Sequence, residues 1–198
     1  MKGIVAILRG VKPDEVIEVA HTLVNAGIDI IEVPLNSPSP LDSIAALSRE
    51  FPSHILIGAG TVLTPEQVDR VADVGARIVL SPNFNAQVVR QSKARGLTSM
   101  PGVATPSEGF DALAAGADAL KLFPSEVLGV SSIKAWRAVF PPTTPMFSVG
   151  GINAENIALF KAAGATGVGI GSSLYSPQID LAELARRASV LVERWNIG

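Results

Sequence analysis

The chain has 198 residues, with 16 Lys and Arg against 18 Asp and Glu, and a net charge of −2. Hydrophobic residues make up 47% and charged residues 17%, which excludes a disordered chain because so apolar a sequence can bury a core. The near-neutral charge argues against nucleic acid or anionic lipid as a partner, and the absence of cysteine excludes disulfides and thiolate metal sites.

The first apolar run covers residues 4–8 and ends at Arg9 and Gly10. This run is too short for the core of a signal peptide, and no other run approaches the roughly 20 residues of a membrane-spanning helix. We therefore expect a soluble, cytoplasmic protein with no membrane partner.

A glycine followed by a short apolar run recurs along the chain, at Gly27, Gly75, Gly96, Gly116 and Gly164. The steps of 48, 21, 20 and 48 residues give a period of about 20–24 residues when each long step is counted as two units. Glycine suits the left-handed residue that ends a helix, and an apolar run suits a strand that is buried on both faces. Eight such strand–helix units fill the chain.

In chain order, the strands are predicted near residues 4–8, 29–34, 55–60, 77–81, 97–101, 118–123, 145–149 and 167–171. Helices are predicted between them, two of which begin at Thr64 and Thr105, each followed by proline, and a last helix is predicted near 180–195. Eight alternating units predict an α/β fold, a (β/α)8 TIM barrel that forms a single domain over residues 1–198. The competing topology is an open doubly wound sheet, but no GxGxxG motif follows the first strand.

Charged residues stand within or at the end of three apolar strands, at Arg9, Glu32 and Lys121. The active site of such a barrel lies where the strands end. Lys121 either forms a structural ion pair with Glu32 or acts as a Schiff-base lysine whose pKa is lowered by apolar surroundings. The second interpretation is favoured because buried ion pairs rarely repay their desolvation. Arg9 is expected to bind an anion.

Glycines follow the last two predicted strands, as Gly150-Gly151 and as Gly171-Ser172. Backbone N–H groups at these two places commonly bind phosphate in this fold, together with the start of a helix that we expect to open at Asn153. The alternative is that the glycines only form tight turns.

Four other residues are expected to have no catalytic role. His21 and His54 fit surface or packing positions, and their spacing does not resemble a zinc site, so no metal is expected. Trp136 and Trp195 fit packing or interface positions.

Six stretches, taken together, resemble the class I aldolases of 2-keto-3-deoxy-6-phosphogluconate and 4-hydroxy-2-oxoglutarate. They are AILRG at 6–10, EVPLNSP at 32–38, GAGTVL at 58–63, ALKLFPS at 119–125, VGG at 149–151 and GS at 171–172. Within this family the chain looks most like the galactonate branch, since Val149 stands where the gluconate branch typically has threonine.

The resemblance implies a role for each matching residue. Lys121 would form the Schiff base and Glu32 would be the general acid and base. The substrate would be bound by Arg9 and Thr61 at its keto-acid end, by Val149 near C4, and by Gly150, Gly151, Gly171 and Ser172 at its phosphate. The resemblance also implies a homotrimer without metal or organic cofactor.

The implied reaction is the reversible cleavage of 2-dehydro-3-deoxy-6-phospho-D-galactonate, a phosphorylated keto acid, to pyruvate and D-glyceraldehyde 3-phosphate. Three alternatives remain at this point. The first is an aldolase for the gluconate epimer or for 4-hydroxy-2-oxoglutarate. The second is a phosphosugar isomerase or epimerase with Glu32 as base, and the third is a phosphate-binding protein without activity.

Overall fold

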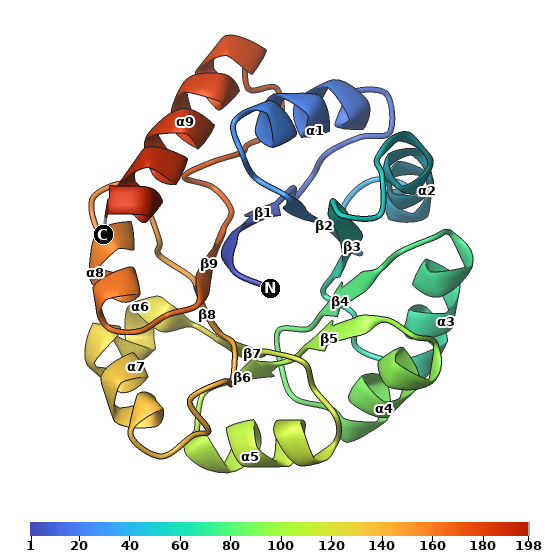
Figure 1. The fold of residues 1–198 in the computed structure, drawn as a ribbon. Coiled ribbons are helices and arrows are strands. Elements are labelled where there is room, and N and C mark those ends of the chain that lie inside the picture. The colour runs from blue at the N-terminus through green and yellow to red at the C-terminus, as the bar shows by residue number, and fades with distance from the viewer. Residues whose placement is uncertain (198) are drawn as a thin grey trace.

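Parallel strands form a barrel inside a ring of helices in the computed structural model, which describes residues 1–197 (Figure 1). The strands are β1 (Gly3–Ile7), β2 (Ile30–Pro34), β3 (Leu56–Gly60), β4 (Ile78–Leu80), β5 (Thr98–Met100), β6 (Gly102–Val103), β7 (Leu120–Leu122), β8 (Met146–Val149) and β9 (Gly167–Ile170). They follow one another around the sheet without a reversal of order, and β1 pairs in parallel with both β2 and β9. The predicted TIM barrel is therefore confirmed, and the doubly wound alternative is wrong.

The fifth predicted strand, 97–101, is the one that differs from the expectation, because it is present as two segments, β5 and β6. β5 pairs with β4 and β6 pairs with β7, and Pro101 lies between them. Proline has no N–H for a ladder hydrogen bond, so the strand changes neighbours at this residue. The barrel is nevertheless bridged here, since the Pro101 carbonyl accepts a hydrogen bond from the Lys121 N–H at 2.9 Å.

The helices surround the barrel and alternate with its strands. They are α1 (Val16–Asn25), α2 (Pro40–Glu50), α3 (Pro65–Asp73), α4 (Ala86–Ala94), α5 (Pro106–Ala114), α6 (Ser125–Leu128), α7 (Val130–Arg137), α8 (Ile157–Ala162) and α9 (Leu181–Ile197). Both predicted caps are present: Thr64 accepts from the Gln67 N–H, and Thr105 forms a capping box with Glu108. The expected helix start at Asn153 is wrong. Asn153 accepts from the backbone N–H groups of Glu155 and Asn156 in a turn, and α8 begins only at Ile157.

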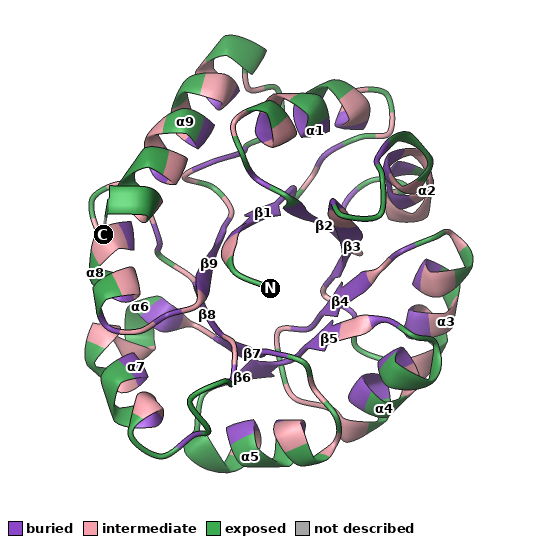
Figure 2. Ribbon diagram, in the orientation of Figure 1, coloured by how far each residue is buried: buried purple, intermediate pink, exposed green. Residues whose placement is uncertain are grey.

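The buried residues form two layers, one between strands and helices and a smaller one inside the barrel (Figure 2). The inner layer consists of Val5, Ile30, Ile78, Leu80, Met100, Ala119 and Phe147. Phe147 fills space that a side chain on β9 would otherwise need, since a Cβ on Gly167 would overlap its ring. The inside of the barrel is thus packed and not a channel.

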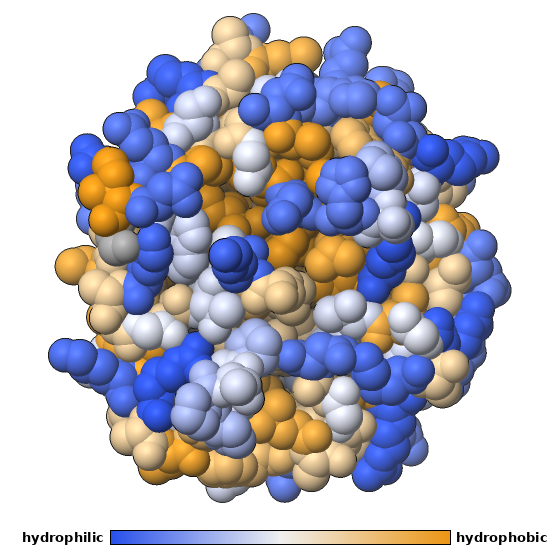
Figure 3. Space-filling view, in the orientation of Figure 1, coloured by the Kyte–Doolittle hydropathy of each residue, from blue (hydrophilic) through white to orange (hydrophobic). Residues whose placement is uncertain are grey.

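The amino terminus lies at the centre of the face shown in Figure 1. In the same orientation, Figure 3 shows hydrophilic residues over much of the rim of this face and hydrophobic ones nearer its centre. None of the helices within residues 1–197 combines the length and the apolar character needed to span a bilayer.

Candidate active site

Side chains two residues apart in a strand lie on the same face, and this places the candidate site next to the inner core, at the carboxyl ends of the strands. Four strands each point one apolar side chain into that core and, two residues further on, a second side chain into a cavity. The inner residues are Val5, Ile30, Ala119 and Phe147, and the outer ones are Ile7, Glu32, Lys121 and Val149. The core therefore forms the floor of the cavity, and the chemistry lies on it.

The cavity has a volume of about 500 Å³ and opens at the ends of the strands. It brings together every residue that the sequence nominated for catalysis or substrate binding. Its lining includes Arg9, Glu32, Thr61, Lys121, Val149, Gly150, Gly151, Gly171 and Ser172. These residues come from loops and strands spread over more than 160 positions of the chain, so their meeting in one cavity is a result of the barrel.

Lys121 and Glu32 are both buried, at 6% and 2% exposure. Within residues 1–197 neither side chain takes part in an ion pair closer than 4.0 Å, so the structural ion pair considered above is not formed. Burial lowers the pKa of the Lys121 amine below its ordinary 10.5; the charge of Glu32 opposes this shift, and that of Arg9 adds to it. Burial likewise raises the pKa of Glu32 above 4.5, against smaller opposing effects of Lys121 and Arg9. Both groups are pushed towards their neutral forms.

Gly60, at the end of β3, makes room for the Glu32 carboxyl group. A Cβ at residue 60 would overlap the carboxylate oxygens of Glu32, so only glycine permits this side chain to lie here. The sequence showed this glycine only as part of the GAGT stretch and not as a neighbour of Glu32.

Thr61 follows in a strained conformation, with φ of +57°. A β-branched residue rarely adopts the left-handed region, and such strain is concentrated at functional sites. Arg9 extends from the end of β1 to the end of β2, where its guanidinium donates to Asn36 Oδ1 at 3.3 Å. A cationic side chain and a strained hydroxyl residue thus border the part of the cavity next to Glu32.

A second part of the cavity lies at the ends of the neighbouring strands β8 and β9. Gly150 and Gly151 have φ of +106° and +69°, conformations that favour glycine. Gly171 and Ser172 follow the neighbouring strand β9 and line the same part of the cavity. This part of the lining carries no cationic side chain, so an anion here would be bound by N–H and hydroxyl groups.

Several lining residues were missed by the sequence reasoning, among them Pro82, Phe123, Tyr175 and Pro177. The Lys121 Nζ lies 5.1 Å from the centre of the Phe123 ring. Tyr175 is the chain's single tyrosine and follows the last strand by five residues. Its position close to a strand end could have suggested a place in the cavity, but it belongs to none of the motifs considered. Burial and the nearby Glu15 raise the pKa of Tyr175, so it remains a hydroxyl donor.

The residues expected to be inert lie outside the cavity lining. His21 is half-exposed and pairs with Glu50 at 2.8 Å, and His54 is exposed. Trp136 stacks against Phe140 with ring centres 5.3 Å apart. Trp195 lies under the Lys161 Nζ. No group of three or more His, Cys, Asp or Glu side chains suited to hold a metal occurs in the part of the chain that the structure describes.

Fold and cavity together define a TIM-barrel protein with a buried amine and a buried carboxyl group at the mouth of the barrel. The sequence profile of the KDPG and KHG aldolases matches residues 1–189. The chain is 47% identical over 187 residues to a probable 2-dehydro-3-deoxy-6-phosphogalactonate aldolase of Rhizobium meliloti strain 1021, which covers 94% of this chain and 88% of the relative. It is 43% identical to the 2-dehydro-3-deoxy-6-phosphogalactonate aldolase of Escherichia coli K12, with 97% and 94% covered.

A solved structure described as native KDPGal gives a TM-score of 0.96 at 43% identity, with 98% of this chain and 94% of that chain covered. The chain belongs to the KDPG and KHG aldolase family of lyases.

Proposed function

We propose that the protein is a class I aldolase that reversibly cleaves 2-dehydro-3-deoxy-6-phospho-D-galactonate to pyruvate and D-glyceraldehyde 3-phosphate. The observation that carries this proposal is the pair of Lys121 and Glu32, both buried on the floor of one cavity and not joined in an ion pair. The names of the two relatives with 47% and 43% identity support the choice of substrate.

The covalent step uses the unprotonated Lys121 amine, which a lowered pKa makes available. Its Nζ attacks C2 of the keto acid, and the carbinolamine loses water to give a protonated imine. As the C4 hydroxyl gives up its proton, the electron pair of the C3–C4 bond moves into the imine. D-Glyceraldehyde 3-phosphate leaves, and an enamine remains on Lys121. Protonation of the enamine at C3 and hydrolysis of the imine release pyruvate and restore the amine.

Glu32 is the group that moves the protons. Its carboxylate, directly or through a water, takes the C4 hydroxyl proton, and the resulting acid returns a proton to C3 of the enamine. A pKa raised above 4.5 suits this exchange, because it makes the carboxylate a stronger base towards the hydroxyl proton. Because Gly60 has no side chain, the Glu32 carboxyl group has space to lie in this position.

The two ends of the substrate are bound by different loops. Arg9 and Thr61 hold the carboxylate of the keto acid beside the imine carbon. Gly150, Gly151, Gly171 and Ser172 hold the phosphate through backbone N–H groups and the serine hydroxyl. Val149, two residues beyond the core residue Phe147, faces the C4 region between them.

The test is reduction with borohydride in the presence of pyruvate, followed by mass spectrometry of the peptides. We expect the mass of one reduced pyruvyl group on Lys121 and on no other lysine. A phosphosugar isomerase or epimerase that uses Glu32 as base, or a phosphate-binding protein without activity, would not be labelled. The same experiment on Lys121→Met, with Lys134→Met as a surface control, identifies the site.

We further propose that each chain forms one domain over residues 1–198 and assembles as a homotrimer in the cytoplasm. The family resemblance supports the trimer, and the charged phosphate ester, which does not cross membranes unaided, supports the compartment. Native mass spectrometry measures the number of subunits directly, and a monomer or dimer at working concentration would contradict the trimer.

A further inference from the structure

Two loops that are far apart in the chain lie against each other at the rim of the cavity. The first loop, residues 8–15, joins β1 to α1, and the last loop, residues 171–180, joins β9 to α9. Each carries a group that we assign to the substrate: Arg9 for the carboxylate and Ser172 for the phosphate. The distance between these loops therefore sets the spacing between the two anion-binding ends.

One hydrogen bond joins the loops directly. The Tyr175 hydroxyl donates to Glu15 Oε1 at 3.1 Å, across 160 positions of sequence. The same oxygen accepts from the Lys12 N–H at 3.0 Å, so the carboxylate is itself fixed to the first loop. Tyr175 is 3% exposed and is one of the residues that line the cavity. The bond is partly buried and has a charged acceptor, which places it among the stronger hydrogen bonds.

A second contact lies nearby. Gly10 has φ of +85°, and Pro177 covers it so closely that a Cβ on Gly10 would come within 2.8 Å of the proline Cγ. Gly10 directly follows Arg9. The last loop therefore contacts the first loop at two places, near its start at Gly10 and at its end at Glu15.

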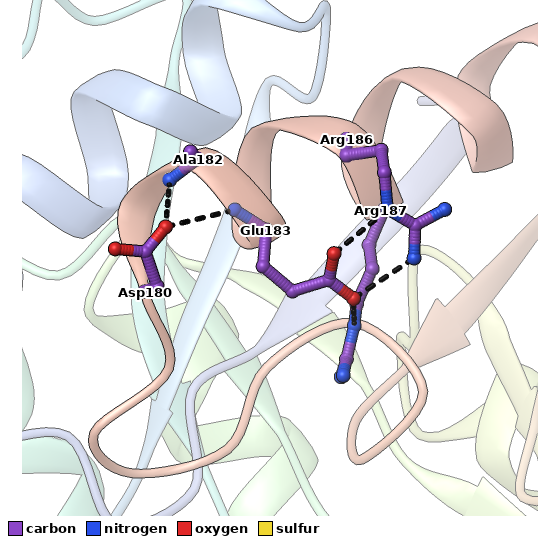
Figure 4. A network of polar contacts seen from close by, with 5 residues as sticks. All are labelled: Asp180, Ala182, Glu183, Arg186 and Arg187. Atoms are coloured by element: carbon purple, nitrogen blue, oxygen red, sulfur yellow. Dashed lines mark hydrogen bonds and ion pairs between the residues drawn. The ribbon is translucent and has the colours of Figure 1, made fainter.

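The last loop is held at its two ends independently of these contacts. At its start, the N–H groups of Leu174 and Tyr175 both donate to the Gly171 carbonyl at 2.9 Å. At its end, Asp180 caps α9 by accepting from the N–H groups of Ala182 and Glu183 (Figure 4). Ser173 Oγ also donates to the Ile152 carbonyl, which ties the start of the loop to the residues after β8. The contacts of Tyr175 and Pro177 are those that join the middle of the loop to the loop of Arg9.

We infer that Tyr175 is a positioning residue that, through Glu15, holds the phosphate-binding loop at the right distance from Arg9. This inference rests on the proposed function. Without the hydroxyl, the last loop samples more conformations, and only the fraction with the correct spacing binds both ends of the substrate. The apparent affinity for a long substrate falls in proportion to that fraction.

Pyruvate provides an internal comparison, because it has the carboxylate and the keto group but no phosphate. Arg9 has its own anchor in Asn36, which does not depend on the last loop. Binding of pyruvate and the exchange of its methyl protons are therefore expected to be independent of Tyr175, whereas cleavage of the phosphorylated acid is not.

The experiment compares Tyr175→Phe, Glu15→Ala, Glu15→Gln and the double variant Tyr175→Phe/Glu15→Ala with the parent enzyme. We expect KM for the phosphorylated acid to rise roughly three- to tenfold in Tyr175→Phe and in Glu15→Ala, with little change in kcat. Glu15→Gln keeps an acceptor oxygen but loses the charge, so its KM should lie between those of the parent and of Glu15→Ala. The KM of the double variant for the phosphorylated acid should be no higher than that of Glu15→Ala, because each substitution removes the same Tyr175–Glu15 hydrogen bond.

Glu50→Ala is the matched control, since it removes another glutamate-accepted bond between two elements, that to His21, outside the cavity. The KM of Glu50→Ala for the phosphorylated acid, and its KM for pyruvate in the exchange reaction, should equal those of the parent. Thermal unfolding shows whether each variant is folded. An active parent whose Tyr175→Phe variant is unchanged, or loses affinity for pyruvate equally, would refute the positioning role alone. A parent that neither cleaves the acid nor exchanges pyruvate protons would refute the proposed function and this inference with it.

Discussion

Replacing Lys121 with methionine should abolish activity and at the same time stabilise the protein. The side chain is 6% exposed, and its burial lowers the pKa of the amine below 10.5. Each unit of that lowering corresponds to about 1.4 kcal/mol of unfavourable interaction with the protonated form. Methionine has a similar length and no charge to desolvate. Replacing even a buried ion pair with fitting apolar residues is often neutral or stabilises by about 1–4 kcal/mol. Lys121 has no ion-pair partner within residues 1–197 to lose, so we expect a gain in that range at pH 7.

The gain should depend on pH in one direction. The unfolded lysine binds its proton up to pH 10.5, whereas the folded one releases it at lower pH. Between these two pKa values unfolding takes up a proton, so the free energy of unfolding of the parent rises with pH. The penalty is complete below the folded pKa and is lost as the pH approaches 10.5. The advantage of Lys121→Met should shrink over the same interval.

The measurement is denaturant unfolding of the parent and of Lys121→Met at a series of pH values, together with cleavage and pyruvate exchange. For a chain of 198 residues, a gain of 1 kcal/mol corresponds to a rise in Tm of about 2–4 °C. Lys134→Met is the control, because Lys134 is exposed and should shift stability by less than about 0.5 kcal/mol. A Lys121→Met protein less stable than the parent, or a difference in free energy of unfolding that does not change with pH, would refute the argument that burial disfavours the charged amine. Cleavage that survives in this variant would refute the role of Lys121.

Three further variants test other residues of the cavity. Glu32→Gln should lower turnover by about 10²–10⁴-fold while still forming the imine slowly, as borohydride trapping and deuterium exchange of the pyruvate methyl group would measure. Thr61→Gly should relieve left-handed strain of about 1–3 kcal/mol, less about 0.4–1 kcal/mol for the freer unfolded chain, and yet raise KM about tenfold through the lost hydroxyl. We expect the parent to prefer the galactonate epimer but also to cleave the gluconate epimer. Val149→Thr should move the ratio of kcat/KM for the two epimers towards the gluconate form by about three- to tenfold, because threonine adds a hydrogen-bond partner near C4.

Each of these predictions has an outcome that would contradict it. Unchanged proton exchange in Glu32→Gln would show that another group moves the proton. A Thr61→Gly protein that is less stable than the parent would mean that the positive φ is not strained. A parent that accepts only the gluconate epimer would refute the branch assignment, and an unaltered ratio in Val149→Thr would refute the role of Val149.

The sequence was enough to predict the barrel and the residues that line its cavity. The glycine-terminated units repeat because a helix that ends in a left-handed residue is followed by a strand that is buried on both faces, so local physics sets the repeating unit. The charges at Arg9, Glu32 and Lys121 could be noticed because they interrupt or end apolar strands. In a parallel barrel such strands all end on the same side, which brings the three residues together without further information.

Tertiary structure alone decided how these groups are related in space. The free space that Gly60 leaves for Glu32, the strained φ of Thr61 and the change of neighbours at Pro101 depend on contacts between strands that no local pattern encodes. The absence of an ion pair between Lys121 and Glu32 depends on side-chain distances within the described residues, which spacing along the chain does not determine. The bond from Tyr175 to Glu15 spans 160 positions and forms only because closing the barrel places its first and last loops side by side.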